Sequence, residues 1–281
     1  YFSLYYNTTG GGNAASGATS LENNKTGNAN TAHGDASLYH NTTGNSNTAT
    51  GANSLFQNST GSNNTAIGVS AGTMGSNFFN STAIGSNAIV DTSNKVRIGN
   101  TSVTSIGGEV SWTTFSDGRY KKEIKENVPG LSFINSLRPV TYTVNVNGLN
   151  EYYTKRMKPL PEKETNGKSD PEVEKSISEA SKTVYSGFIA QEVEKTAKEI
   201  NYQFDGVNAP QNPTDNYSIA YSQFVPSLVK AVQELSNENE EQKKINTDLQ
   251  NQIDELKLLI QLGNQQSINI NQTSASLEQN I

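Results

Sequence analysis

The chain has 281 residues, of which 33% are hydrophobic and 23 are glycine, and its formal net charge is −6. Its Lys and Arg residues are interleaved with acids, which excludes the clustered basic surface that nucleic-acid binding needs. It has no cysteine and no apolar run near the roughly 18 residues that span a bilayer, so disulfides, thiolate metal sites and membrane insertion are also excluded. We expect no cofactor and no metal.

The segment 1–100 repeats with a period of 17 residues. Three columns keep this spacing, namely the glycine of Ala-x-Gly, a second glycine, and a leucine preceded by serine: Gly17, Gly34, Gly51, Gly68 and Gly85; Gly10, Gly27, Gly44 and Gly61; Leu4, Leu21, Leu38 and Leu55. A disordered Gly/Ser/Asn linker would not hold several columns in register. The first copy starts only at Ser3 and the chain opens without an initiator Met, so we expect further turns upstream.

A period this short, with small residues at fixed places and one Leu per turn, predicts that each repeat forms one coil of a parallel β-solenoid or β-roll. Glycine would form the corners, and asparagine side chains would stack in ladders from coil to coil. One Leu and one or two Ala per coil make a thin core at about 25 cal/mol per Å² of buried apolar surface. We therefore expect several chains to pack around an axis.

Coils that read Asn64-Thr65-Ala66-Ile67-Gly68 resemble the head repeats of trimeric autotransporter adhesins. The resemblance implies that the solenoid is trimeric. His33 and His40 lie within the repeats, where we interpret them as surface substitutions rather than metal ligands or members of a catalytic triad.

Behind the repeats, apolar residues at Val103, Ile106, Val110 and Trp112 predict one or two short strands, so we assign 101–115 as a β linker. The next stretch lies where the nearly uncharged repeats meet a charged C-terminal half, and it reads Ser116-Asp117-Gly118-Arg119-Tyr120-Lys121-Lys122. Taken alone, Ser-Asp-Gly followed by two lysines is typical of a β-turn with a solvated face.

The C-terminal half alternates short helices and strands. Apolar residues at helical spacing predict a helix between Pro129 and Pro139. Alternation over 140–146 predicts a strand that ends in a hairpin turn at Asn147-Gly148. The segment 155–182 is rich in charges and predicts a solvated excursion with one polar helix from Pro171.

A helical face with Val193 and Ala197 follows, and the chain then enters a long heptad pattern. The pattern predicts a coiled coil over 228–262, followed by a flexible tail rich in Gln, Asn and Ser over 263–281. Heptads of this kind permit two or three strands. The two core positions are Leu228, Leu235, Gln242, Leu249 and Leu256, and Val232, Asn239, Asn246, Ile253 and Ile260.

Four motifs in this order resemble the intramolecular chaperone domain of the peptidase S74 family, the C-terminal chaperone of endosialidase tail spikes and phage tail fibres: Ser116 to Lys121, Leu137-Arg138-Pro139-Val140, Gly187-Phe188-Ile189-Ala190-Gln191-Glu192-Val193 and Tyr221-Ser222-Gln223-Phe224. We assign 116–227 to this domain. The expected fold is mixed, with an N-terminal parallel β-solenoid, an α+β chaperone domain and a long coiled-coil helix.

The resemblance also implies that the domain drives trimerisation and folding of the fibre before it, and then cuts itself off through a Ser-Lys dyad. Carried over to this chain, Ser116 is the nucleophile, Lys121 is the general base, and the scissile bond joins Ser116 to Asp117. Arg119 and Lys122 are cations that would favour the neutral form of Lys121.

Two other functions compete with this one. The chain could be a structural surface fibre or adhesin that keeps its C-terminal domain as a permanent trimer anchor. A glycan-degrading spike is disfavoured, because the repeats hold almost no acids that could act as paired carboxylates. The expected partners are two further copies of the chain and, through the upstream fibre, a receptor or glycan on a host surface. The expected location is a virion tail fibre, or the extracellular or cell surface.

Overall fold

The computed structural model describes residues 1–157 and 171–278. It forms two compact units, each built from several stretches of the chain. The first contains Tyr1–Lys122, Arg138–Glu194 and Val207–Ile219, and the second contains Glu123–Leu137, Lys195–Gly206 and the residues from Ala220 onward.

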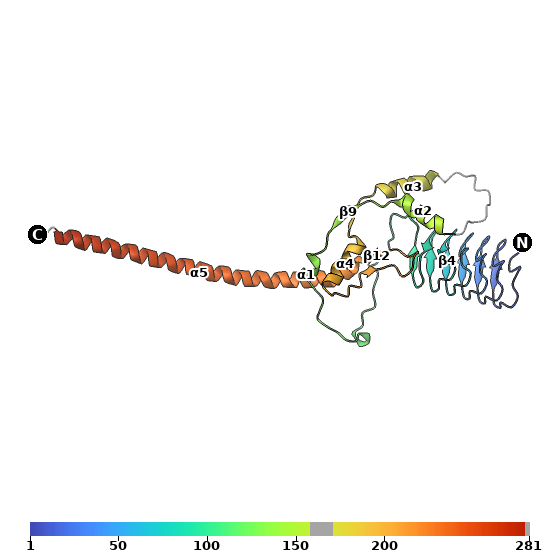
Figure 1. The fold of residues 1–281 in the computed structure, drawn as a ribbon, viewed down its shortest axis with the longest axis horizontal. Coiled ribbons are helices and arrows are strands. Elements are labelled where there is room, and N and C mark those ends of the chain that lie inside the picture. The colour runs from blue at the N-terminus through green and yellow to red at the C-terminus, as the bar shows by residue number, and fades with distance from the viewer. Residues whose placement is uncertain (158–170, 279–281) are drawn as a thin grey trace. The chain divides into compact units, whose positions relative to one another are not determined.

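The N-terminal region is a parallel β-solenoid of about five turns, whose coils lie side by side in Figure 1. Its strands are β1 (Ala14–Ser16), β2 (Thr31–His33), β3 (Thr48–Thr50), β4 (Thr65–Ile67), β5 (Gly72–Thr73), β6 (Thr82–Ile84), β7 (Ile89–Val90) and β8 (Val96–Ile98). Six of them form one sheet in the order β1-β2-β3-β4-β6-β8, and β5 pairs with β7. This confirms the solenoid prediction.

Strands of neighbouring coils pair in a register that equals the 17-residue period of the sequence. Ala32 pairs with Ala49 and Ala49 with Ala66, so equivalent residues of neighbouring repeats stand directly above one another. The last coil differs, because β6 pairs with β8 through Thr82 and Val96, which are only 14 residues apart. The shorter final coil is a feature that the repeat pattern did not predict.

One chain closes around the solenoid core. Leu21, Leu38 and Leu55 have at most 1% of their surface exposed, and the strand alanines, such as Ala49, are equally buried. The thin core that led us to expect several chains around an axis is therefore already covered within a single chain. The reason is that buried asparagine side chains fill the remaining interior.

These asparagines form two ladders. In the first, the side-chain amide of Asn41 donates to Asn24 Oδ1 at 2.8 Å and to the Gly44 carbonyl at 3.0 Å, and Asn58 donates in turn to Asn41. In the second, Asn47 accepts a hydrogen bond from the Asn64 backbone N–H. Each buried amide is thus paired, which removes the cost of burying a polar group.

The corners depend on two glycine columns for two reasons. A Cβ at Gly44 would lie 2.2 Å from the carbonyl oxygen of Gly61, so the close approach of neighbouring coils requires glycine there. Gly51 has φ +126°, a conformation that L side chains rarely adopt. The leucine column also has a left-handed backbone, since Leu38 has φ 51°. The backbone N–H of Leu38 donates a hydrogen bond to the carbonyl of Ser54 in the next coil.

Residues 101–115 contain no strand, so the predicted β linker is wrong. Val110 and Trp112 are each 85% exposed. Apolar alternation marks a strand only where a neighbouring strand supplies the hydrogen-bond ladder, and none lies beside this segment in the described residues.

The remaining part of the first unit is α+β. It contains the 3₁₀ helix η1 (Gly118–Tyr120), β9 (Val140–Tyr142), α2 (Val146–Arg156), α3 (Pro171–Lys182), β10 (Tyr185–Gly187), the first half of α4 (Ala190–Glu199), β11 (Val207–Asn208) and β12 (Ser218–Ile219). Strands β9 and β10 pair antiparallel, as do β11 and β12. The helix from Pro171 is confirmed, and Val193 and Ala197 are buried on α4 as the predicted face requires.

The hairpin turn expected at Asn147-Gly148 is wrong, because both residues lie in the first turn of α2. The side chain of Asn145 caps this helix by accepting a hydrogen bond from the Gly148 N–H at 2.9 Å. An Asn two residues before the Asn-Gly pair is an N-cap signal, and it overrides the turn preference of the pair. Part of the charged segment 155–182 lies outside the described residues.

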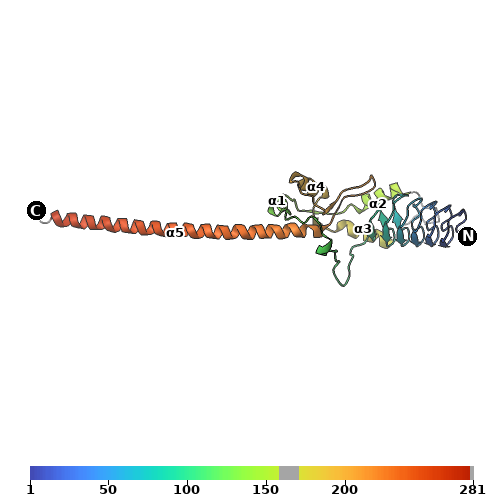
Figure 2. The ribbon, with the colours of Figure 1, turned by 90° about the horizontal axis from the view of Figure 1, so that it is seen from below.

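The second unit is organised by aromatic packing and a long helix. It contains α1 (Leu131–Ile134), the 3₁₀ helix η2 (Tyr221–Phe224) and α5 (Val225–Glu278), which Figure 2 shows as one continuous helix. Phe133 is fully buried against Tyr202, Phe204 and Phe224, with ring centroids 5.0 to 6.2 Å apart. Glu234 of α5 accepts a hydrogen bond from the first N–H of α1 at 2.7 Å.

Helix α5 continues past Gly263, at which the sequence predicts the start of a flexible tail. One glycine costs a helix only about 1 kcal/mol, and Gln, Asn and Ser are weak helix formers rather than breakers. None of the helices in the described residues combines the length and hydrophobicity that crossing a bilayer requires.

We predict that Asn41→Ala lowers the free energy of unfolding of the solenoid by about 2–3 kcal/mol, because it leaves buried partners in the adjacent coils unpaired. Thr43→Ala in the same coil is the control, since the Thr43 side chain is exposed, and it should cost less than about 0.5 kcal/mol. Urea denaturation followed by circular dichroism measures both. Equal losses would show that the ladder is not a source of stability.

Candidate functional site

The structure brings Ser116 and Lys121 together. The Nζ atom of Lys121 donates a hydrogen bond to Ser116 Oγ at 2.8 Å, and both residues are exposed in the single chain. A hydroxyl and an amine at this distance can exchange a proton, which is the geometric requirement for a serine activated by a base. In this hydrogen bond the amine of Lys121 is the donor, so the amine must lose a proton before it can act as the base.

A local turn produces this contact. Asp117 is the N-cap of η1, and its carboxylate accepts a hydrogen bond from the Arg119 N–H at 2.9 Å. The backbone N–H of Lys121 then bonds to the Gly118 carbonyl at 3.2 Å, which folds the chain back toward Ser116. The predicted tight turn at Asp117-Gly118 therefore exists, and its mechanism is an aspartate cap on a single 3₁₀ turn.

Arg119 serves the turn rather than the amine. Its guanidinium makes a bidentate contact with Asp117, in which Nε donates to Oδ1 at 3.1 Å and Nη2 donates to Oδ2 at 2.6 Å. These side-chain hydrogen bonds, followed by the backbone bond from Arg119, lower the pKa of Asp117, and the same contact raises the pKa of Arg119. Lys122 is exposed and makes no hydrogen bond or ion pair with the residues that the structure describes.

Two of the other sequence motifs meet each other. Gly187 of β10 pairs with Val140 of β9, and Arg138 Nε donates to Glu192 Oε2 of α4 at 3.1 Å. The Arg138–Glu192 pair is largely exposed, so it contributes little stability by itself. Within the described residues, no hydrogen bond or ion pair joins these motifs to Ser116 or Lys121.

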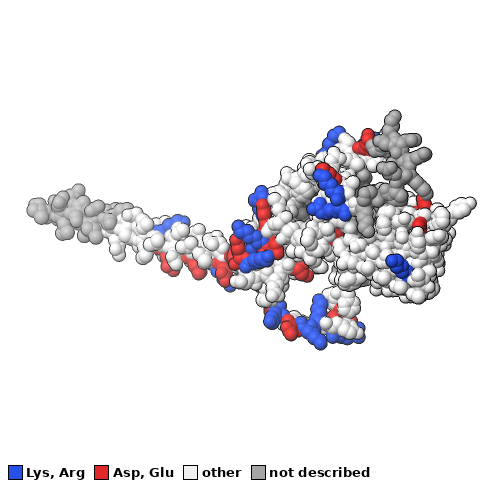
Figure 3. Space-filling view, turned by 45° about the vertical axis from the view of Figure 1, so that its right-hand side comes forward, with Lys and Arg blue, Asp and Glu red and all other residues white. Residues whose placement is uncertain are grey.

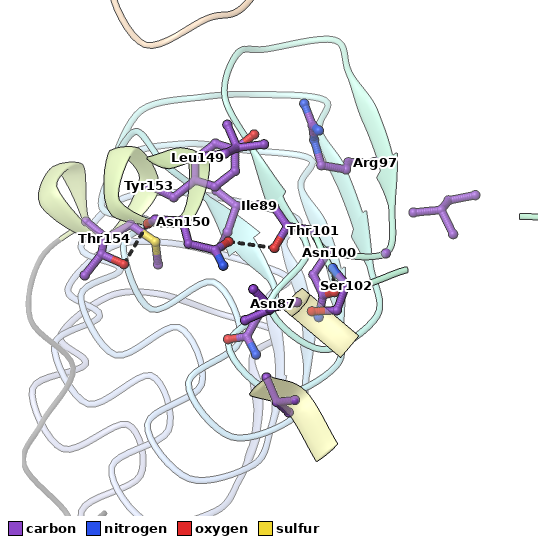
Figure 4. Close-up of a pocket in the computed structure, with 15 residues that line it drawn as sticks. Asn87, Ile89, Arg97, Asn100, Thr101, Ser102, Leu149, Asn150, Tyr153 and Thr154 are labelled. Carbon is purple, nitrogen blue, oxygen red and sulfur yellow. Dashed lines mark hydrogen bonds between the residues drawn. The ribbon is translucent and has the colours of Figure 1, made fainter. Parts of the chain in front are cut away.

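A cavity of about 380 Å³ lies elsewhere in the same unit, between the last solenoid coils and α2 (Figure 4). Its lining includes Ile89, Arg97, Thr101, Asn150 and Tyr153, but neither Ser116 nor Lys121. Burial is the main cause that raises the pKa of the Tyr153 hydroxyl. Sequence reasoning missed this cavity because its walls come from segments about 50 residues apart.

The described residues hold no cluster of His, Asp or Glu that would bind a metal ion. The solenoid surface carries few charges, as the mostly white region of Figure 3 illustrates.

Residues 116–201 match the model of the peptidase S74 family, which is described as chaperone of endosialidase. The match begins at Ser116 itself. The matched segment follows the β-solenoid along the chain. No curated protein and no solved structure matches the chain.

We predict that Arg119→Ala raises the pKa of Asp117 towards its ordinary value, because the side-chain donors are lost. The lowered pKa means that the carboxylate supports the turn at neutral pH and loses this role only as the pH falls through that lowered value. Titration of carbon-13-labelled Asp carboxyls by NMR measures the shift. Arg138→Ala, which removes a guanidinium bound to Glu192, is the control and should leave Asp117 unchanged; a pKa that stays low in Arg119→Ala would contradict the assignment.

Proposed function

We propose that the chain is the C-terminal part of a trimeric fibre, in which the segment from Ser116 acts as an intramolecular chaperone and then releases itself by autoproteolysis. The observation that carries the proposal is the 2.8 Å contact between Lys121 Nζ and Ser116 Oγ, at the first residue of the matched domain. A virion tail fibre is the location that the family description favours, and a host-surface receptor or glycan would be bound by the fibre upstream.

The exposed stripe of α5 supports assembly through copies of the same chain. Leu235, Leu249 and Ile253 are each 46 to 50% exposed at heptad core positions. Burying such side chains contributes about 1.5–3 kcal/mol each. A single isolated helix leaves them in contact with water, so it does not gain this stabilisation. A parallel coiled coil of three copies is the arrangement we propose.

The polar middle of the stripe would align the chains. Asn239, Gln242 and Asn246 occupy core positions, where polar side chains restrict register and strand number at a cost in stability. Register matters here, because a parallel solenoid forms by pairing residues 17 positions apart and has no hairpins to guide it. Holding three C-terminal ends together raises the local concentration of the chains that must fold side by side.

Self-cleavage needs a neutral Lys121 that accepts the Ser116 hydroxyl proton. In one chain the site is open to water, and the exposed apolar side chains of Val110, Trp112 and Phe115 precede it. We propose that packing of the copies covers this apolar segment together with the site. Removal of water favours the neutral form of a lysine in general, so cleavage would follow assembly and not precede it.

The net reaction is hydrolysis of the Ser116–Asp117 peptide bond. The C–N bond breaks, water supplies the hydroxyl of the new Ser116 carboxyl group, and the second hydrogen of that water goes to the new amine of Asp117. Attack of Ser116 Oγ on its own carbonyl would close a strained β-lactone. We therefore propose that the hydroxyl attacks the equivalent bond of a neighbouring copy, which forms an ester that water then hydrolyses.

The second candidate function is a fibre that keeps this domain as a permanent trimer anchor. The exposure of both Ser116 and Lys121 favours it, because an exposed lysine is an ordinary surface residue. The two functions differ in the chain length of the mature protein.

We predict that the purified protein consists of two fragments that meet at Ser116, whereas Ser116→Ala and Lys121→Ala remain full length. Intact-mass spectrometry of freshly purified samples measures this. Lys125→Ala is the matched control, since it removes another exposed amine a few residues away, and it should still be cut. Full-length wild-type protein would support the anchor function instead, and cleavage in Lys121→Ala would remove Lys121 as the base.

We predict that Ser116→Ala chains are cut when they are co-produced with wild-type chains, because a neighbouring copy supplies the hydroxyl. A mass tag on the Ser116→Ala chain distinguishes the two. Native mass spectrometry of the mixture separates oligomers that contain different numbers of tagged chains, and the number of such species gives the number of chains per oligomer. Denaturing mass spectrometry then reports which chains were cut. Cleavage confined to wild-type chains within mixed oligomers would refute attack between copies.

A further inference from the structure

The last coil of the solenoid carries a charged cluster that the other coils lack. Asp91 has a fully buried side chain, and it accepts hydrogen bonds from Lys95 Nζ at 2.9 Å and Arg97 Nη2 at 3.2 Å. Elsewhere in the repeats only Glu22, Lys25 and Asp35 are charged. The charges are therefore concentrated where the solenoid ends.

The loop between β11 and β12 completes this cluster. Asp215, whose side chain is 5% exposed, accepts a hydrogen bond from Lys95 Nζ at 2.8 Å. Asn216 donates to Asp91 Oδ2 at 3.2 Å, Asn212 donates to Thr92 Oγ1 at 2.9 Å, and the Thr214 hydroxyl bonds to the Asp91 carbonyl at 3.1 Å. Loop and coil are thus joined through both charged and neutral groups.

Lys95 and Asp215 form the central pair of this cluster, and the shifts of their pKa values favour the charged form of each. Burial alone would lower the pKa of Lys95, but hydrogen bonds to Asp215 and Asp91 outweigh it and raise the pKa. Burial would likewise raise the pKa of Asp215, but the bond from Lys95 and the backbone N–H groups of Gln211 and Asn216 lower it. Both groups are therefore charged throughout the neutral pH range.

A second contact joins the same two regions. The Thr101 hydroxyl and Asn150 Oδ1 of α2 lie 2.6 Å apart, as the dashed line in Figure 4 marks. Met157, just after α2, lines a small cavity together with Ile89 and with Phe56 of an earlier coil. Helix α2 thus lies against the last coils at several points.

All of these contacts join residues before Ser116 to residues after it. We propose that the loop 209–217 and α2 form a non-covalent latch, which keeps the chaperone domain on the last solenoid coil after the backbone is cut. This inference rests on the proposed function, because it describes how that release is controlled. Cleavage and separation are then distinct steps, and the fragments part only when the Lys95–Asp215 contact opens.

The physical reason is the burial of the charges. A partly buried ion pair such as Lys95–Asp215 is screened less by salt than an exposed pair, and removing one partner leaves the other charge without compensation. The latch also contacts the last coil of the solenoid, and β8 is the last strand of its sheet among the described residues. Terminal coils of repeat proteins need such a cover.

The latch can be tested without autoproteolysis. In a Ser116→Ala background, a recognition sequence for a site-specific protease is inserted between Gly107 and Gly108, which are exposed and have open space around them. After external cleavage, size-exclusion chromatography and a pull-down through a C-terminal tag report whether the N-terminal fragment stays bound. We expect co-elution, and separation of the two fragments on cutting would overturn the proposal.

Variants then test the cluster itself. Asp215→Asn combined with Asn216→Ala should speed dissociation of the cut fragments by more than about tenfold, since Lys95 and Asp91 lose partners. Asp205→Asn removes the same charge from an exposed position and should leave the dissociation rate unchanged. Equal rates in all three proteins would refute the latch. Because self-cleavage is absent from this design, a failure here is separate from a failure of the Ser116→Ala mass test.

Discussion

Parallel pairing of equivalent residues one coil apart is the constraint on which the rest of this structure depends. It places the asparagine amides in ladders, the leucines in one column and the glycines where neighbouring coils approach most closely. A slip of one residue would expose the leucines and leave the buried amides without partners. Such a fold gains stability only when many long-range pairs form together, which is the physical reason that folding of a parallel solenoid is slow.

The transition between the two halves of the chain combines three features within a short distance in sequence. The repeats end in a shortened, charged coil, an exposed apolar segment follows, and the Ser116–Lys121 turn comes next. We propose that the charged coil retains the chaperone domain after the cut, that the apolar segment packs between copies of the chain, and that the Ser116–Lys121 turn carries out the cleavage. The same arrangement would let the fibre finish folding before its chaperone leaves, because each step uses a different set of contacts.

The errors of the sequence analysis have a common physical origin. Alternating apolar residues predicted strands over 101–115 and 140–146, but a strand forms only beside a partner, and periodicity in one segment carries no information about partners. Strand β9 formed where β10 lies beside it, whereas Asn145 capped a helix a few residues later. Area counts of apolar side chains made the solenoid core look thin for another reason, because they omit buried, fully hydrogen-bonded asparagines.

The sequence by itself determined the solenoid, its period and the helical C-terminal part, because these depend on local patterns: fixed columns and helical spacing. The candidate pair Ser116 and Lys121 came from the resemblance to the peptidase S74 family, and a local turn brings the two side chains together. Only the tertiary structure decided which distant segments meet. The contacts of Asp91 with Asn216 and of Thr101 with Asn150 join residues far apart in the chain. No periodicity records such pairs, since each depends on how separate elements pack and on the pairing of charges that burial would otherwise make costly.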